Sequence, residues 1–324
     1  MHTISDFQNV VESELSKQEF VVEPQGLYQP IEYVMSMGGK RIRPTLCLAG
    51  CYLFIDDISK AIKPSLALEI FHNFTLLHDD IMDNADVRRN QPTVHKKWDN
   101  NTAILSGDAM LIKAYQYAAG IDEKYLKDVL NLFSQTAIEV CEGQQYDMEF
   151  ELRDDVTVDD YLTMIRLKTA VLLAASLKTG AIIGGADTKN ADLLYDFGVN
   201  IGLAFQLQDD FLDVYGDIKT FGKAIGGDIV ANKKTFLLIN ALQMASGTVK
   251  SDLQTWIDAK DFNAEEKIEA VRNIYNTLKI DTLAKEKMNF YFNQAISALN
   301  QINGRESMKE ELQKFAFQLI ERSR

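Results

Sequence analysis

The sequence predicts a single all-α domain, and three observations support this fold class. Apolar residues recur at helical spacing almost throughout the 324 residues. No segment has a convincing period-2 strand pattern, and 5 prolines and 18 glycines are few for a strand-rich chain of this length. Apolar residues make up 46% of the chain, which is enough for a sizeable core. Because no repeat or long linker interrupts the pattern, we expect residues 1–324 to form one large helical bundle.

The hydrophobic periodicity places the helices in order along the chain. They are predicted at about 3–18, 27–37, 43–55, 61–85, 98–119, 124–145, 157–184, 188–216, 234–246, 250–259, 264–300 and 305–322. Short connections carry helix-stop residues, for example Gly38-Gly39, Gly120, Gly184-Gly185 and Gly226-Gly227. Asp159 and Ser251 are predicted to lie in first turns or at helix caps.

Charge and cysteine content exclude several classes of function. A net charge of −13 disfavours a nucleic-acid partner and a surface that binds anionic lipid. Three cysteines do not indicate a disulfide framework, and we interpret the i, i+4 pair Cys47 and Cys51 as small core residues rather than metal ligands. No signal peptide is evident, and the apolar run Ala170–Gly185 is interrupted by Lys178. We therefore expect a cytoplasmic protein without stable membrane insertion.

A cluster of carboxylates ends the predicted helix 61–85. Asp79, Asp80 and Asp83 close this apolar helix, and Asp79 and Asp83 share one face, one turn apart. His72 lies on the same face, as does Asp86 if the helix continues that far. Like charges at i, i+4 repel, and a hard divalent cation with oxygen ligands would offset the cost. Taken alone, the cluster is equally compatible with a solvated helix end or with carboxylates paired to Arg88 and Arg89.

The same D-D-x-x-D pattern recurs in residues 205–213, FQLQDDFLD, where Asp209, Asp210 and Asp213 end another apolar helix. Two copies in this setting are hard to obtain by chance. If the two helices face each other, they form an acidic mouth over an apolar shaft. Mg²⁺ would let such a mouth accept an anion, because Mg²⁺ prefers carboxylates together with substrate phosphate oxygens.

Basic residues alternate with the two acidic clusters, as a phosphate site requires. They are Lys40, Arg41 and Arg43 at a predicted helix start, Arg88-Arg89 after the first cluster, Lys168 beside Thr169 inside an apolar helix, and Lys223 and Lys233-Lys234 after the second cluster. Arginine suits bidentate phosphate binding, and free backbone N–H groups at a helix start favour anions.

Residues 38–235 contain a series of motifs. In order, they are GGKRIRP, HDDIMD with RR and PTVH, LSGDAML, EGQQYDME, LKTA, FQLQDDFLD and FGKAIGGDIVANKKT. This series resembles the trans-polyprenyl diphosphate synthases, the family of farnesyl and geranylgeranyl diphosphate synthases. The resemblance implies an all-α bundle around a deep central cavity, usually a homodimer. It also implies a reaction that joins isopentenyl diphosphate to dimethylallyl, geranyl or farnesyl diphosphate and releases pyrophosphate. The expected partners are therefore small isoprenoid diphosphates.

The resemblance also implies roles for individual residues. Asp79, Asp83 and Asp209 would ligate Mg²⁺, with three ions per active site, and Asp80, Asp210 and Asp213 would support them. Arg88, Lys168, Lys223 and Lys233 would hold the allylic diphosphate. Lys40, Arg43, His72 and Arg89 would hold isopentenyl diphosphate, while Thr169 and Gln206 would face the developing allylic cation. One departure is Asn90 where the family usually has glycine, although asparagine tolerates the left-handed turn conformation.

Product length is expected to depend on residues that precede Asp79. Phe71, Phe74 and Thr75 would lie about 12, 7.5 and 6 Å below the metals along an ideal helix. An aromatic residue followed by a small one before the motif resembles the archaeal-type geranylgeranyl synthases, which implies a twenty-carbon product, with fifteen carbons as the alternative. An ideal helical wheel places Thr75 and Phe71 near the face of Asp79 and Phe74 further round.

Three other functions were weighed. A class I terpene cyclase would share the fold and the first Asp motif, but its second motif usually carries Ser or Thr and then Glu, and it needs no isopentenyl site. A non-catalytic regulatory subunit would tend to lose one Asp motif, and both are intact here. A calcium-binding structural protein would want glycine-containing, ligand-rich loops rather than apolar helices that end in DDxxD.

Overall fold

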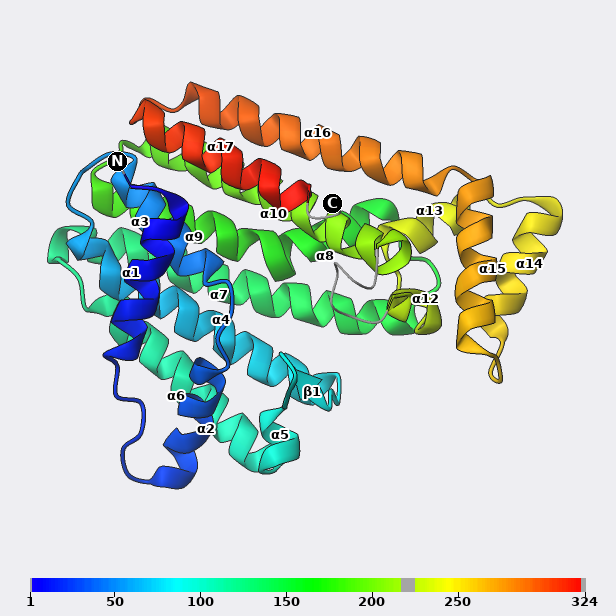
Figure 1. Cartoon of the computed structure of the whole chain (residues 1–324), viewed down its shortest axis with the longest axis horizontal. Coiled ribbons are helices and arrows are strands. Elements are labelled where there is room, and N and C mark those ends of the chain that lie inside the picture. Colours follow the sequence, from blue (N-terminus) through cyan, green and yellow to red (C-terminus); the bar gives the residue numbers. More distant parts are fainter. Residues whose placement is uncertain (1, 217–224, 322–324) are drawn as a thin grey trace. The chain divides into compact units, whose positions relative to one another are not determined.

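The computed structural model describes residues 2–216 and 225–321 (Figure 1). The chain divides into two compact units. Unit 1 comprises Met1–Gln135, Ala175–Tyr195 and Ile302–Leu312, and unit 2 comprises Thr136–Ala174, Asp196–Gln301 and Gln313–Arg324. Apart from one two-stranded hairpin, the regular structure in the described ranges is helical, which confirms the predicted all-α class. The organisation as a single domain stays a prediction.

Unit 1 contains the N-terminal helices. They are α1 (Ile4–Ser16), α2 (Gln25–Ser36), α3 (Ile42–Tyr52), the 3₁₀ turn η1 (Ser59–Ala61), α4 (Ile62–Met82), α5 (Val94–Lys97) and α6 (Asn100–Ala119). The long helix α4 packs against α3 and α6. Its residues from Pro64 to Phe71 are all buried, so its apolar length forms the centre of this core.

Helix α3 crosses the C-terminal part of α9 (Val171–Gly184) at backbone contact. A Cβ at Gly180 would stand 1.9 Å from the carbonyl oxygen of Cys47, and one at Gly50 would stand 2.4 Å from that of Leu177. Only glycine leaves room for such an approach. Cys47 and Cys51 are buried at this crossing, which agrees with their interpretation as core residues.

A short hairpin follows α4, formed by β1 (Val87–Arg88) and β2 (Gln91–Pro92). Its two central residues, Arg89 and Asn90, both have positive φ values of 52° and 60°. Two successive residues at positive φ are the signature of the tight turn that matches strand twist. Asn90 therefore adopts the left-handed turn conformation, as predicted.

Unit 2 contains most of the later helices. They are α8 (Val158–Ile165), the π-helix η2 (Arg166–Ala170), α12 (Gly227–Val230), α13 (Phe236–Met244), α14 (Gly247–Asp258), α15 (Ala264–Thr277) and α16 (Ile280–Gln301). Helices α7 (Glu123–Leu152), α9, α10 (Thr188–Tyr215) and α17 (Glu306–Ile320) contribute residues to both units.

Two apolar clusters hold unit 2 together. One joins Tyr161 of α8, Leu207 of α10 and Met288 of α16, and the other joins Leu238 of α13, Leu253 of α14 and Val271 of α15. Helices α14 and α15 lie side by side in Figure 1. Helices α16 and α17 do so as well, and the rings of Phe292 and Phe317 lie 6.4 Å apart. The Asp-bearing end of α10 thus rests on a packed apolar base.

The stretch Val158–Gly184 forms 27 continuous helical residues that are long and apolar enough to cross a membrane. In the structure, 72% of its most apolar window is buried against the rest of the chain. Lys178, which interrupts the apolar run, pairs with Asp192 at 2.6 Å. This burial is typical of a core helix in a soluble protein.

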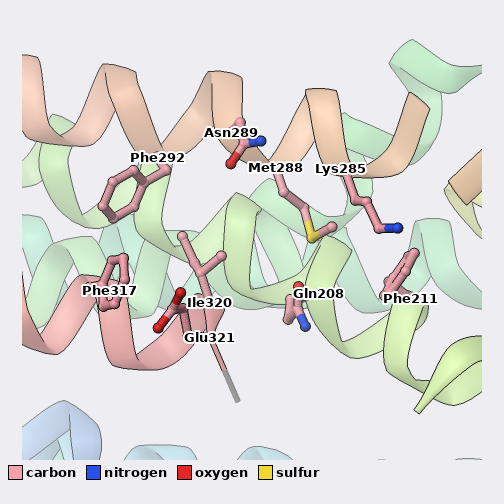
Figure 2. A pocket seen from close by; sticks show the side chains of 9 residues that line it. All are labelled: Gln208, Phe211, Lys285, Met288, Asn289, Phe292, Phe317, Ile320 and Glu321. Atoms are coloured by element: carbon pink, nitrogen blue, oxygen red, sulfur yellow. The ribbon is translucent and has the colours of Figure 1, made fainter. Parts of the chain in front are cut away.

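Side chains of α10, α16 and α17, with Glu321 beyond the end of α17, line a partly open cavity of about 350 Å³ in unit 2 (Figure 2). Phe211, Met288, Phe292, Phe317 and Ile320 supply its apolar lining. Gln208, Lys285, Asn289 and Glu321 supply its polar lining. None of the predicted site residues that the structure describes lines this cavity.

Several expected boundaries were wrong for local reasons. The predicted helix 264–300 is two helices, because Lys279 adopts a φ of 57° after α15 ends. Helix α4 ends at Met82, so Asp86 does not continue the face of Asp79. Asp159 lies in the first turn of α8 as predicted, whereas Ser251 lies beyond the first turn of α14 and Ser246 is its N-cap.

Candidate functional site

A group of cationic and imidazole side chains gathers in unit 1 at the start of α3. Arg43 lies 3.1 Å from the ring of His72 (Nη1 to Nε2), and Arg89 donates a hydrogen bond to the carbonyl oxygen of Gly38. Gly39, with a φ of 136°, brings the backbone so close that a Cβ there would stand 2.9 Å from the guanidinium of Arg89. The sequence predicted Arg43, His72 and Arg89 as one subsite, and the fold brings them together.

The electrostatics of this group favour an anion. Burial and then the charges of Arg43 and Arg89 hold the pKa of His72 well below its usual range. Burial lowers the pKa of Arg43 to about 10, although the nearby Glu69 opposes the shift. The Nε atom of Arg43 is buried without a hydrogen-bond partner in the described part of the chain. A bound anion would accept that hydrogen bond and offset the cost of gathering these cations.

The neighbouring basic residues of GGKRIRP have different environments. Arg41 is buried and pairs with Glu69 at 2.7 Å and Glu12 at 3.1 Å, and it also donates to the carbonyl oxygen of Met35. Lys40 is exposed. Arg41 therefore stabilises the fold, which leaves Lys40 and Arg43 as the residues of this motif that can meet a ligand.

The first Asp motif lies at the C-terminal end of α4, with Asp79 and Asp80 in its last turn and Asp83 as its C-cap. Arg88 on β1 lies 2.7 Å from Asp80 and 3.5 Å from Asp79. Burial raises the pKa of Asp80 above its ordinary value, and the hydrogen bond and charge of Arg88 oppose the rise. The alternative interpretation paired these carboxylates with both arginines. Arg88 makes such a pair, whereas Arg89 bonds to Gly38. The hairpin places a cation beside the acidic helix end.

The second Asp motif lies in the last two turns of α10, in unit 2. Asp210 is buried, accepts a hydrogen bond from Gln206 at 3.0 Å and accepts another from the hydroxyl of Tyr161. The hydroxyl of Thr169 donates to the side-chain carbonyl of Gln206 at 3.2 Å. A continuous network therefore joins Thr169, Gln206 and Asp210, three of the predicted site residues.

Two carboxylates that the sequence did not single out complete this acidic group, Asp147 on α7 and Asp228 on α12. Burial raises the pKa of Asp228 to about 6, and the charges of Asp213, Asp209 and Asp147 add to the rise. Burial also raises the pKa of Asp210 to about 7. Asp147 belongs to EGQQYDME and Asp228 to FGKAIGGDIVANKKT. Only the fold brings the N–H of Asp228 to the carboxylate of Asp213 and the charge of Asp147 near Asp228.

The donor set fits a hard divalent cation that shares its ligands with a substrate. Carboxylates crowded into a poorly solvated space favour a cation, because positive charge offsets their repulsion and restores their charged forms. Across residues 2–216 and 225–321, no three acidic, histidine or cysteine side chains form a metal cage by themselves. Mg²⁺ is usually bound through one or two carboxylates with water and substrate phosphates, so the arrangement suits it.

Two of the predicted lysines of unit 2, Lys168 and Lys233, lie beside this acidic group. Lys168 on η2 donates to Asp147 at 2.6 Å. Lys233 follows α12, and its backbone N–H bonds to the carbonyl oxygen of Asp228 at 2.9 Å. Lys234 instead lies 3.5 Å from Asp154. Lys223 lies outside the described residues.

The residues expected to set product length line one turn of α4. Phe71 and Phe74 are buried, with ring centroids 5.6 Å apart, and Phe74 also lies 4.8 Å from the ring of His78. Thr75 is only partly buried, and its hydroxyl donates to the carbonyl oxygen of His72. The two aromatic rings are thus part of the core, while Thr75 is partly exposed.

Comparisons with known proteins agree with this arrangement. A family model described as polyprenyl synthetase matches residues 24–275. The short chain isoprenyl diphosphate synthase of Methanocaldococcus jannaschii is 42% identical over 253 residues, which cover 78% of this chain and 77% of that protein. A crystal structure of a geranylgeranyl pyrophosphate synthase is 42% identical and covers 100% of both chains, with a TM-score of 0.95. The geranylgeranyl pyrophosphate synthase of Corynebacterium glutamicum, solved with isoprenyl diphosphate and magnesium, is 25% identical, covers 98% of this chain and 96% of that one, and has a TM-score of 0.83.

Proposed function

Given that this chain belongs to the polyprenyl synthetase family and is a short-chain prenyltransferase, we propose that it extends an allylic diphosphate with isopentenyl diphosphate mainly to twenty-carbon geranylgeranyl diphosphate. The observation that carries this proposal is the cluster of Arg43, His72 and Arg89. Within this cluster, the Nε of Arg43 is buried and has no hydrogen-bond acceptor in the described part of the chain. A second diphosphate site of this kind separates a condensing enzyme from a terpene cyclase, which needs only one.

Pyrophosphate release and product analysis test the function directly. We expect release only when isopentenyl diphosphate and an allylic diphosphate are both present, with a twenty-carbon product by mass spectrometry. Release from the allylic substrate alone, with a cyclic hydrocarbon as product, would indicate a cyclase. A purified chain with no release under any combination would instead match a non-catalytic subunit.

The proposed ligands come from the two Asp motifs and the basic residues that accompany them. Asp79, Asp83 and Asp209 hold Mg²⁺, with three ions in the active site, and Asp80, Asp210 and Asp213 support them. Arg88, Lys168, Lys223 and Lys233 hold the allylic diphosphate. Bound Mg²⁺ neutralises the diphosphate leaving group. Thr169 and Gln206 face the allylic carbon that loses it, and their mutual hydrogen bond at 3.2 Å fixes how they point.

Lys40 and Arg43 are proposed to bind isopentenyl diphosphate selectively. We expect Arg43→Ala to raise the apparent KM for that substrate about tenfold or more, because a charge-assisted contact to an anion contributes roughly 1.5–3 kcal/mol. Lys40→Ala should act in the same direction. The KM for the allylic substrate should stay within about twofold, and Lys17→Ala at an exposed position of α1 serves as a control. Equal increases for both substrates would show that the two diphosphate sites are wrongly assigned.

Thr75 is proposed as the residue that sets the floor of the product shaft. We expect Thr75→Phe to shorten the product from twenty to fifteen carbons, because added bulk closes the space beside a partly buried side chain. Phe74→Ala should lengthen the product, at a cost in stability of about 3 kcal/mol or more from the cavity left beside His78. Product chain length is read by chromatography. An active Thr75→Phe enzyme with an unchanged product would mean that the shaft runs elsewhere.

A homodimer in the cytoplasm remains the proposed state of the protein. Helix α6 supports an interface between copies, since Ile104, Leu105 and Ile112 are 45%, 59% and 61% exposed. Apolar side chains grouped on one exposed helix mark a contact surface. Light scattering should give the mass of two chains, and a mass of one chain at micromolar concentration would contradict this proposal.

A further inference from the structure

Lys267 on α15 is the one lysine within residues 2–216 and 225–321 that is buried, at 1% exposure. Its ammonium group donates to the carbonyl oxygen of Val230 at 3.3 Å and lies 4.2 Å from the centre of the Phe262 ring. No carboxylate of the described chain lies within salt-bridge distance of it, and burial lowers its pKa. A buried cation without a counter-charge is costly, so the carbonyl and the aromatic face must offset that cost.

Lys267 contacts the C-terminal end of α12. Val230 is the last residue of that four-residue helix, and its carbonyl has no continuing turn to bond to. The next residue of α15, Ile268, packs against the start of α12 so closely that a Cβ at Gly226 would stand 2.5 Å from it. Beyond α12, the side chain of Asn232 donates to the carbonyl oxygen of Ile257 at 3.0 Å. Helix α12 is therefore held to α15 at both ends.

Helix α12 in turn connects two parts of the proposed diphosphate site. The N–H of Gly226 donates to the backbone carbonyl of Asp213 at 2.6 Å, and the N–H of Asp228 donates to its carboxylate at 2.9 Å. On the other side, the N–H of Lys233 donates to the carbonyl oxygen of Asp228 at 2.9 Å. A shift of α12 would move Asp213 and Lys233 together.

We propose that Lys267 is a positioning residue for the metal and allylic-diphosphate half of the active site, acting through α12 on Asp213 and Lys233. Its described contacts are with Val230 and Phe262, and it lies on a helix that no motif of the sequence marks. This role rests on the proposed assignment of Asp213 and Lys233. Rate enhancement by preorganised charges is sensitive to displacements of about 1 Å, which a loosened α12 would produce.

The test compares Lys267→Met, which keeps the apolar stem but removes the donor, with Lys267→Arg, which keeps a cationic donor. Lys260→Met, at an exposed position just before α15, is the matched control. Lys267→Met should raise the Mg²⁺ concentration for half-maximal activity and the KM for the allylic substrate, each about tenfold, as a small misplacement at a reacting centre does. The KM for isopentenyl diphosphate should stay within twofold. Lys267→Arg should recover most of the loss.

Amide hydrogen exchange supplies a second readout that does not depend on turnover. Residues 225–235 should exchange faster in Lys267→Met than in the wild type, with no change around Arg43. Unchanged Mg²⁺ and allylic parameters in a folded Lys267→Met enzyme would overturn the proposal, as would an equal loss for isopentenyl diphosphate. If that variant does not fold, Lys267→Gln, which removes the charge and shortens the side chain but keeps a polar group, must show the same selective pattern in a milder form. A wild type that needs no Mg²⁺, or Asp213→Ala without effect, would instead overturn the site assignment.

Discussion

Asp209→Ala and Asp79→Ala are each expected to lower kcat by at least about a hundredfold without unfolding the protein, as loss of a strong electrostatic contact at a reacting centre does. Asp209 is partly exposed at the end of α10, and its charge contributes to the raised pKa of Asp228. Its removal therefore relieves repulsion among carboxylates, so the fold should tolerate the change. Turnover is measured at saturating Mg²⁺, with circular dichroism and Tm as checks on folding.

Two controls make this result specific to the Asp motifs. Asp252→Ala, at an exposed position of α14, and Asp86→Ala, beyond the end of α4, remove the same charge outside the motifs. Both should keep turnover within about threefold, because exposed substitutions away from a site have small effects. Near-normal turnover in both motif variants would overturn the metal assignment.

Helix positions and the two Asp motifs were predictable because they depend on local sequence. Apolar periodicity requires only neighbours three or four residues apart, and D-D-x-x-D at the end of an apolar helix fixes which carboxylates share a face. The break at Lys279 was missed because the apolar pattern continues through it, and a single residue at positive φ leaves no periodic signal.

The partners of the site residues were less predictable because they come from distant segments. GGKRIRP presents three cations in four positions, and only the fold separates the ion-paired Arg41 from Arg43, which reaches His72. In the same way, Asp228 stands fifteen residues after Asp213, and its carboxylate joins that group only because α12 folds back onto α10. The sequence alone assigns no role to the residues of EGQQYDME, although Asp147 contacts Lys168.

The glycine of that motif carries the second large prediction. Gly143 on α7 lies against the π-helix η2, where a Cβ would stand 2.3 Å from the backbone N of Lys168 and 2.7 Å from its Cα. Backbone atoms cannot move aside as the end of a flexible side chain can. Any side chain at Gly143 must therefore push η2 away from α7, and Lys168 with it.

Gly143→Ala is expected to lower the free energy of unfolding by about 1–3 kcal/mol, the usual range for overpacking a core contact. It should also lower kcat tenfold or more, because the 2.6 Å contact between Lys168 and Asp147 is displaced at a preorganised charge. Gly26→Ala is the matched control, since nothing lies within 4 Å of a Cβ there and alanine in α2 should stabilise by about 0.5–1 kcal/mol. Urea unfolding and steady-state turnover measure both effects. A Gly143→Ala enzyme as stable and active as the wild type would show that α7 and η2 do not approach so closely, and would remove the reason for glycine at this position.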